Sequence, residues 1–265
     1  MAIDTEVQAT LVVRDLLNNE PLSLRVLEAN DRDLPTYAEA APEEFLSIIE
    51  RDLKTETPAV LGLLRPASTG MFGHSPSRTG MLWALEGLAW NPQPLPRAAL
   101  ILARMAQVEI NDNWVNKPTH SLQSIFRSWM PQTAANHEAR VDLMKKLAER
   151  YPDVAWQICV SQFGSMHEVG DYSHKPRWRP DGYGFGEPFP TKGPIMKFKV
   201  EMAEMALNWS LNACSTLKCS SWYVSVLSLP PVAMAESSRK RTCGSNFSGS
   251  RRTIANAARG RFAFT

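Results

Sequence analysis

Residues 133–163, TAANHEARVDLMKKLAERYPDVAWQICVSQF, carry the clearest structural pattern in the chain. Their apolar positions recur at helical spacings of three, four and three, at Val141, Met144, Ala148 and Tyr151. The expected polar face carries His137, Glu138, Arg140, Lys145 and Glu149. The predicted helix begins at Thr133 and ends before Pro152–Asp153. Asp153 can cap a second helix over 154–163. Two helices joined by so short a connection must fold back on each other.

Similar short amphipathic segments fill residues 42–163. They predict helices over 42–54, over 80–90 with Thr79 as the N-cap, over 95–108, and after a capping Ser121. A further helix is expected over 4–17, with Val7, Leu11 and Leu16 facing inward, followed by a turn-rich stretch over 18–35. No period-2 alternation is present. The expected fold class is all-α, an α-solenoid-like array of short antiparallel helix pairs of the HEAT or TPR general type, although no exact repeat is found.

The charge distribution divides the chain. Residues 1–204 carry 26 Asp and Glu against 21 Lys and Arg, whereas residues 205–265 carry one acidic residue, Glu236, against eight basic ones. The expected domains are an N-terminal helix with an irregular lead-in (1–41), a helical-repeat domain with a long Gly/Pro/aromatic loop (42–211, loop 164–194) and a poorly structured basic Ser/Arg-rich tail (212–265). The tail is interpreted as a frameshifted or truncated product, a basic arm for nucleic acid, or a folded segment around 222–235.

Composition excludes several classes of protein. With 44% hydrophobic and 21% charged residues the chain is typical of globular proteins, and it shows no secretory signal and no apolar run of membrane-spanning length. The four cysteines, Cys159, Cys214, Cys219 and Cys243, form neither a C-x-x-C pair nor zinc-finger spacing. We therefore expect reduced thiols, a cytoplasmic location and no membrane partner.

The loop 164–194 contains the segment that most resembles a functional site, HKPRWRP at 174–180. Cations interleaved with aromatic rings can clamp phosphates and stack on bases, or dock a protein. The predicted partner-binding residues are Lys175, Arg177, Trp178, Arg179, Tyr183 and Phe185. The alternative is structural, with Trp178 packed against the neighbouring helix pair and the arginines paired with acidic residues of the body.

No catalytic residue or cofactor is predicted. The glycines of DGYGFGE (181–187) lack dinucleotide-binding spacing, and no phosphate-binding loop motif occurs. His167, Glu168 and His174 are weak candidates for a metal site, which would favour a hydrolase. The two histidines are seven residues apart rather than the four that place both on one helix face.

Three segments carry a family resemblance: residues 70–106, residues 113–133, from NWVNKPTHS to WMPQT, and HKPRWR. They resemble a helical region of very large bacterial proteins that bear a sirtuin-like or nuclease-like effector, sometimes with a STAND NTPase, and that are suspected of antiviral defence. The resemblance spans about Leu34 to Arg179. It implies a solenoid that acts as a sensor or scaffold, without the effector or NTPase domains. Those proteins continue their helices beyond the HKPRWR loop, and this chain departs from them after about Leu211.

The sequence thus predicts a non-enzymatic helical-repeat scaffold or sensor fragment of a defence-type protein, binding a macromolecular partner, a protein in the first instance. The alternative is a nucleic-acid-binding protein that uses the basic tail and the Lys175–Arg179 segment.

Overall fold

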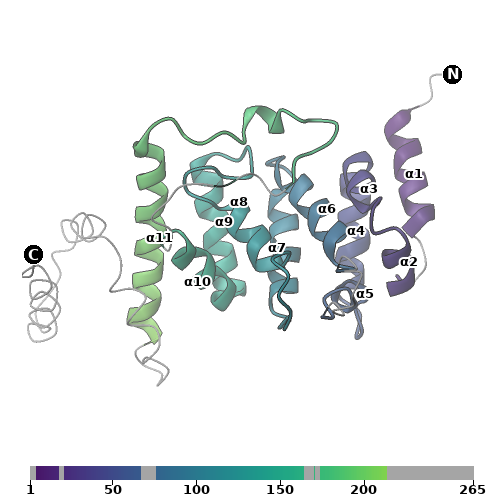
Figure 1. Cartoon of the computed structure of the whole chain (residues 1–265), viewed down its shortest axis with the longest axis horizontal. Coiled ribbons are helices and arrows are strands. Elements are labelled where there is room, and N and C mark those ends of the chain that lie inside the picture. The colour runs from purple at the N-terminus through teal and green to yellow at the C-terminus, as the bar shows by residue number, and fades with distance from the viewer. Residues whose placement is uncertain (1–3, 18–20, 67–75, 164–169, 171–173, 214–265) are drawn as a thin grey trace, which may run out of the picture. The chain divides into compact units, whose positions relative to one another are not determined.

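The computed structural model describes residues 4–17, 21–66, 76–163, 170 and 174–213, and over these residues it is helical without any strand. This confirms the all-α prediction (Figure 1). The helices are α1 Thr5–Leu17, α2 Leu24–Ala29, α3 Leu34–Ala40, α4 Pro42–Asp52, α5 Ala59–Gly62, α6 Thr79–Ala89, α7 Leu95–Ala106, α8 Pro118–Ile125, α9 His137–Arg150, α10 Pro152–Ser161 and α11 Lys192–Ala213, with a short 3₁₀ helix at Gly182–Gly184. The predicted tail 212–265 lies outside the described residues except for the end of α11.

The first helix presents a different face from the predicted one. Val13 and Leu17 are buried where α1 packs against α3 and α4, whereas Val7, Leu11 and Leu16 are exposed. The prediction that these three face inward is wrong, because α1 carries two overlapping apolar stripes and the other one contacts the core.

The stretch 18–35 contains more helix than expected. The Ser23 hydroxyl caps α2 by accepting the backbone N–H of Val26 at 3.3 Å. Pro35 lies in the first turn of α3, where its missing N–H removes no intrahelical hydrogen bond. The turn-rich prediction is therefore wrong for residues 24–29, and Pro35 begins a helix rather than interrupting one.

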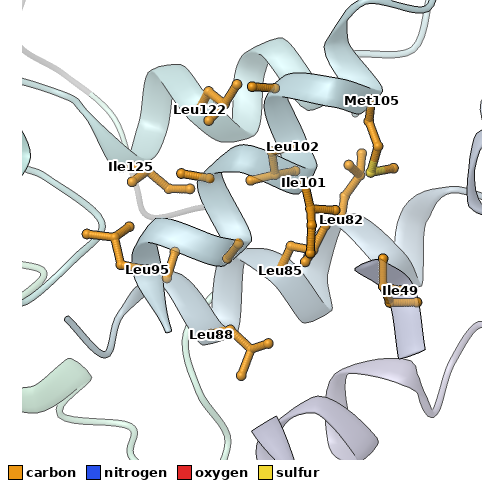
Figure 2. Close-up of a cluster of buried hydrophobic side chains, with 14 of the residues drawn as sticks. Ile49, Leu82, Leu85, Leu88, Leu95, Ile101, Leu102, Met105, Leu122 and Ile125 are labelled. Atoms are coloured by element: carbon orange, nitrogen blue, oxygen red, sulfur yellow. The ribbon is translucent and has the colours of Figure 1, made fainter. Parts of the chain in front are cut away.

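The middle of the core surrounds α6. Figure 2 shows leucine and isoleucine side chains of α4, α6, α7 and α8 meeting in one cluster, with Leu82, Leu85 and Leu88 contributed by α6. Helix α6 is buried on almost all sides because α3, α7 and α8 pack around it. Each such leucine contributes roughly 1.5–3 kcal/mol when fully buried. The cluster is continuous from Val13 to Ala206, so α1 and α11 share one core.

Helices α9 and α10 pack against each other as expected, but their ends differ from the prediction. The side chain of Asn136, not Thr133, caps α9 by accepting the Ala139 N–H at 2.8 Å. Tyr151 both ends α9 and precedes Pro152 at the start of α10, so Asp153 lies inside the helix that it was expected to cap.

Three polar residues also differ from their predicted roles. Thr79 is the first residue of α6 rather than its N-cap, and the first-turn N–H of Gly80 donates to the Asp31 carboxylate at 2.7 Å. Ser121 lies within α8, where its buried hydroxyl donates to the Glu86 carboxylate at 2.5 Å. Arg140, predicted on the polar face, is buried with its guanidinium carbon 4.4 Å from the Phe198 ring centroid, and burial lowers its pKa to about 10.

None of the described helices combines the length and the apolar character that a membrane crossing requires.

Candidate partner-binding surface

Residues 174–189, which we call the strap, lie between α10 and α11 in the sequence and contact residues from three earlier parts of the chain (Figure 1). His174 contacts α6, the backbone of Arg177 contacts α3, and the Phe189 N–H donates to the Trp129 carbonyl at 2.8 Å. These anchors lie at both ends of the strap and fix its course.

Trp90, which directly follows α6, is the principal anchor. It is fully buried, and its indole N–H donates to the His174 carbonyl at 2.7 Å. The Lys175 ammonium lies 5.5 Å from the centroid of the same indole, within cation–π range. Trp90 is therefore a core residue that also supports the strap.

The glycines at every second position of DGYGFGE allow the strap to approach this indole. Gly182 and Gly186 have φ values of +57° and +108°, which disfavour any side chain. A Cβ at Gly182 would lie 2.9 Å from the Trp90 ring, and one at Gly186 would lie 2.7 Å from the Lys175 Cε. Tyr183 between them also adopts a positive φ of 59°. The glycine repeat thus serves close packing.

Glu39 of α3 holds the segment that bears the predicted contact residues. Its two carboxylate oxygens accept the backbone N–H groups of Arg177 at 2.6 Å and of Trp178 at 3.0 Å. Because both main-chain donors face the body, the Arg177 and Trp178 side chains remain exposed on the outside of the strap. No sequence pattern connects residue 39 with residues 177 and 178, so sequence reasoning missed Glu39.

The outer face of the strap is aromatic and cationic. Trp178 is 67% exposed and Phe185 38% exposed. The Arg179 guanidinium lies 4.2 Å from the Tyr183 ring centroid, and its Nε is 3.6 Å from the Asp181 carboxylate. Trp178 is thus mostly exposed, whereas the structural alternative expected it to be packed, and Arg179 pairs with Asp181 of the strap rather than with the body.

Five of the six predicted residues therefore line one exposed segment, and one does not. Lys175 faces inward against Trp90, whereas Arg177, Trp178, Arg179 and Phe185 are exposed and Tyr183 is half-buried. We call Arg177, Trp178, Arg179, Tyr183 and Phe185 the outer face. Partner binding by the outer face stays a prediction.

The histidine that precedes the outer face has a structural position. The His174 imidazole stacks on Trp83 of α6, with ring centroids 5.4 Å apart and an interplanar angle of 4°. Burial lowers the pKa of His174, and Arg177 adds to this while Glu39 opposes it. Its predicted companions His167 and Glu168 lie outside the described residues. Within the described part of the chain no cluster of His, Cys, Asp or Glu has an arrangement that could hold a metal ion.

Comparison with known proteins adds no identification, because no family model, curated protein or solved structure matches this chain.

Proposed function

We propose that the chain is a helical scaffold or sensor fragment that binds a protein partner through the outer face of the strap. The observation that carries this proposal is an exposed tryptophan on a fixed backbone: Trp178 is 67% exposed while its own N–H is bound by Glu39. Tryptophan, tyrosine and arginine dominate the binding energy of protein interfaces. A pre-ordered segment also loses less conformational entropy when it binds.

The charges around the strap favour a protein over a nucleic acid. Lys175 faces Trp90, and Arg179 lies beside Asp181, so few cations of this segment point outward without a nearby carboxylate. Residues 1–204 together carry a net charge of −5, which repels a polyanion. Phosphate-backbone recognition normally needs a stripe of several cations. A protein surface that covers the exposed indole and packs on the two exposed arginines fits the outer face better.

We also propose that the helices form a solenoid-like array of helix pairs. The support is that helices close in sequence contact one another, as in α6 with α7, α7 with α8, α9 with α10 and α10 with α11. In such arrays each unit mainly contacts its neighbours and the array presents a long surface to a partner. A non-enzymatic role within a large bacterial defence-type protein follows from the resemblance of residues 34–179 and belongs to the same proposal.

The experiment compares the full chain with Trp178→Ala and Arg177→Ala, using Lys146→Ala on the exposed surface of α9 as the charge-matched control. Proteins captured by the full chain from native cells are identified, purified and titrated against each variant. We expect Trp178→Ala to raise the Kd at least ~10-fold with an unchanged Tm. Equal affinity for all variants would contradict the proposal.

A second titration tests the nucleic-acid alternative. A labelled single-stranded 20-mer is added to the full chain at about 50 and about 200 mM salt, where phosphate-driven binding weakens steeply. Salt-sensitive binding that Trp178→Ala abolishes would favour the alternative over a protein partner.

A further inference from the structure

The strap is held on the body largely through its main chain. The Trp90 indole N–H donates to the His174 carbonyl at 2.7 Å, and the Glu39 carboxylate accepts the N–H groups of Arg177 and Trp178 at 2.6 and 3.0 Å. Body side chains thus bind one carbonyl and two N–H groups within five consecutive residues. Proteins that capture extended peptides gain affinity from main-chain hydrogen bonds of this kind and specificity from positions for single side chains.

Three consecutive strap residues also place their side chains on the body. The His174 imidazole stacks on Trp83 with ring centroids 5.4 Å apart. The Lys175 ammonium lies 5.5 Å from the centroid of the Trp90 indole, within cation–π range, and Pro176 is buried. The body therefore contacts strap side chains in the order imidazole, lysine, proline.

The body residues of this contact lie on two helices that pack on each other. We call Glu39, Trp83 and Trp90 the body site. Glu39 belongs to α3, Trp83 to α6, and Trp90 directly follows α6. Helices α3 and α6 pack closely against each other, and both contribute to the common core. The helical core therefore sets the positions of these three side chains, and a site on packed helices keeps its geometry better than one on a loop.

We propose that the body site binds an extended peptide of a partner protein, with a histidine or aromatic residue followed by lysine and proline, and that the strap occupies the site in its absence. The strap is itself a bound example of this ligand. Proline holds the preceding lysine extended and offers no N–H of its own. The two residues that follow the proline therefore supply the donors for Glu39.

A partner peptide is a better occupant than the strap of a second copy. Each strap stays tied to its own chain, through the Phe189 N–H and through α11, whose Phe198 and Met202 are fully buried. A tethered strap has an effective concentration on the order of millimolar at its own body site. A partner peptide must therefore bind tightly or arrive when the strap is loosened, and its binding releases the strap and the outer face with it.

The body site is separate from the outer face. The Trp178 side chain is 67% exposed, and only its N–H contacts Glu39. A free peptide that carries Trp178→Ala should therefore bind the body site as well as the unchanged peptide does. The same substitution in the chain removes the indole of the outer face, so failure of one proposal can be told from failure of the other.

The test titrates a labelled peptide of residues 174–180, HKPRWRP with blocked ends, into the full chain and follows its fluorescence anisotropy. Gly186→Ala loosens the strap, because a Cβ there would lie 2.9 Å from the Trp90 ring and 2.7 Å from the Lys175 Cε. Gly184→Ala, with open space around its Cβ, is the matched control. We expect Gly186→Ala to lower the Kd of the peptide at least ~10-fold and Gly184→Ala to lower it less. Lys175→Ala, which removes the cation from the indole without adding an atom, is a second way to loosen the strap.

Further variants in the Gly186→Ala chain locate the bound peptide. Glu39→Ala removes the acceptor of two N–H groups and should raise the Kd at least ~10-fold. Trp83→Ala removes the stacking surface and should raise it at least ~5-fold. The matched control is Trp114→Ala, in the loop 107–117 between α7 and α8, because Trp114 is 41% exposed and Trp83 40%. Trp114→Ala should leave the Kd unchanged.

Four results would overturn the proposal. The first is an equal Kd for the unchanged chain and both loosened variants, and the second is an equal Kd with and without Glu39→Ala and Trp83→Ala. The third is equal binding of a scrambled peptide of the same composition, which would show only attraction between a cationic peptide and an acidic body. The fourth is a dimer of the Gly186→Ala chain that the peptide dissociates, which would assign the site to the strap of a second copy.

Discussion

The Glu39 carboxylate accepts the backbone N–H of Trp178 at 3.0 Å across 139 residues of sequence. The same carboxylate accepts the N–H of Arg177 at 2.6 Å. Exposed side chains next to a fixed backbone are suited to recognition, because their direction is set before a partner arrives.

Removing this carboxylate should loosen the outer face without changing any of its side chains. We expect Glu39→Ala to cost about 1 kcal/mol of folding free energy, because two partly exposed hydrogen bonds to a charged acceptor are lost. Hydrogen exchange should show faster exchange of the Arg177 and Trp178 amides. Glu39→Gln keeps one carbonyl acceptor, so its amide exchange rates should fall between those of the unchanged chain and of Glu39→Ala. Unchanged amide protection in Glu39→Ala would contradict the role given to Glu39.

Substitutions at two glycines of the strap can distinguish the cost of backbone strain from the cost of a steric clash. Gly184 has φ +82° with open space around a Cβ, whereas a Cβ at Gly186 (φ +108°) would lie 2.7 Å from Lys175 Cε and 2.9 Å from the Trp90 ring. We expect Gly184→Ala to cost about 1 kcal/mol from its backbone alone and Gly186→Ala about 2–4 kcal/mol. Urea unfolding measures both, and equal costs would show that the strap does not pack on Trp90.

The buried ion pair of the loop 107–117 should matter far more than an exposed pair. Asp112→Ala leaves the Arg78 guanidinium buried without its carboxylate, which costs about 3–5 kcal/mol. The control is Asp142→Ala, which breaks the exposed pair with Lys145 and should change the stability by less than about 1 kcal/mol. If Asp112→Ala were as mild as Asp142→Ala in chemical denaturation, Arg78 would not hold the loop.

Acidification should weaken the attachment of the strap through His174. Burial lowers the pKa of this imidazole in the folded chain, so the unfolded chain binds a proton first as the pH falls below about 6.5. Folding stability is therefore highest above that pH and is lost as the pH falls toward the lowered pKa. His174→Gln should reduce the fall in Tm between pH 7.5 and 5. His137, whose pKa burial also lowers, should account for part of the remaining fall.

The sequence predicted the helices better than their environments. Val141, Met144 and Leu147 of α9 are buried as their spacing indicates, because that helix has one apolar stripe. Helix α1 has two apolar stripes, and only the tertiary contacts of Val13 and Leu17 determine which one is buried. Arg140 looks like a solvated residue at its helical position, yet the ring of Phe198, 58 residues later, covers it. Contacts between distant residues leave no periodic signal in one sequence.

The sequence predicted which residues form the candidate surface, but not which distant residues hold it in place. The cations and aromatic rings of residues 174–185 indicated a recognition segment, and most of them are exposed. Their anchors, Glu39 and Trp90, lie far away in the sequence. The glycine alternation, whose spacing does not fit dinucleotide binding, reflects the close approach of Gly182 and Gly186 to a buried indole.

Helix α6 also fixes the relative position of two segments that attach near its ends. The loop 107–117 is attached through Arg78, just before α6, and the strap through Trp90, just after it, so the length of α6 sets the distance and the angle between the two attachment points. An insertion or deletion of one residue within α6 would rotate the two attachment points by about 100° and shift them by about 1.5 Å relative to each other. A point substitution can alter the loop 107–117 or the strap alone. A change in the length of α6 alters the angle between the two segments.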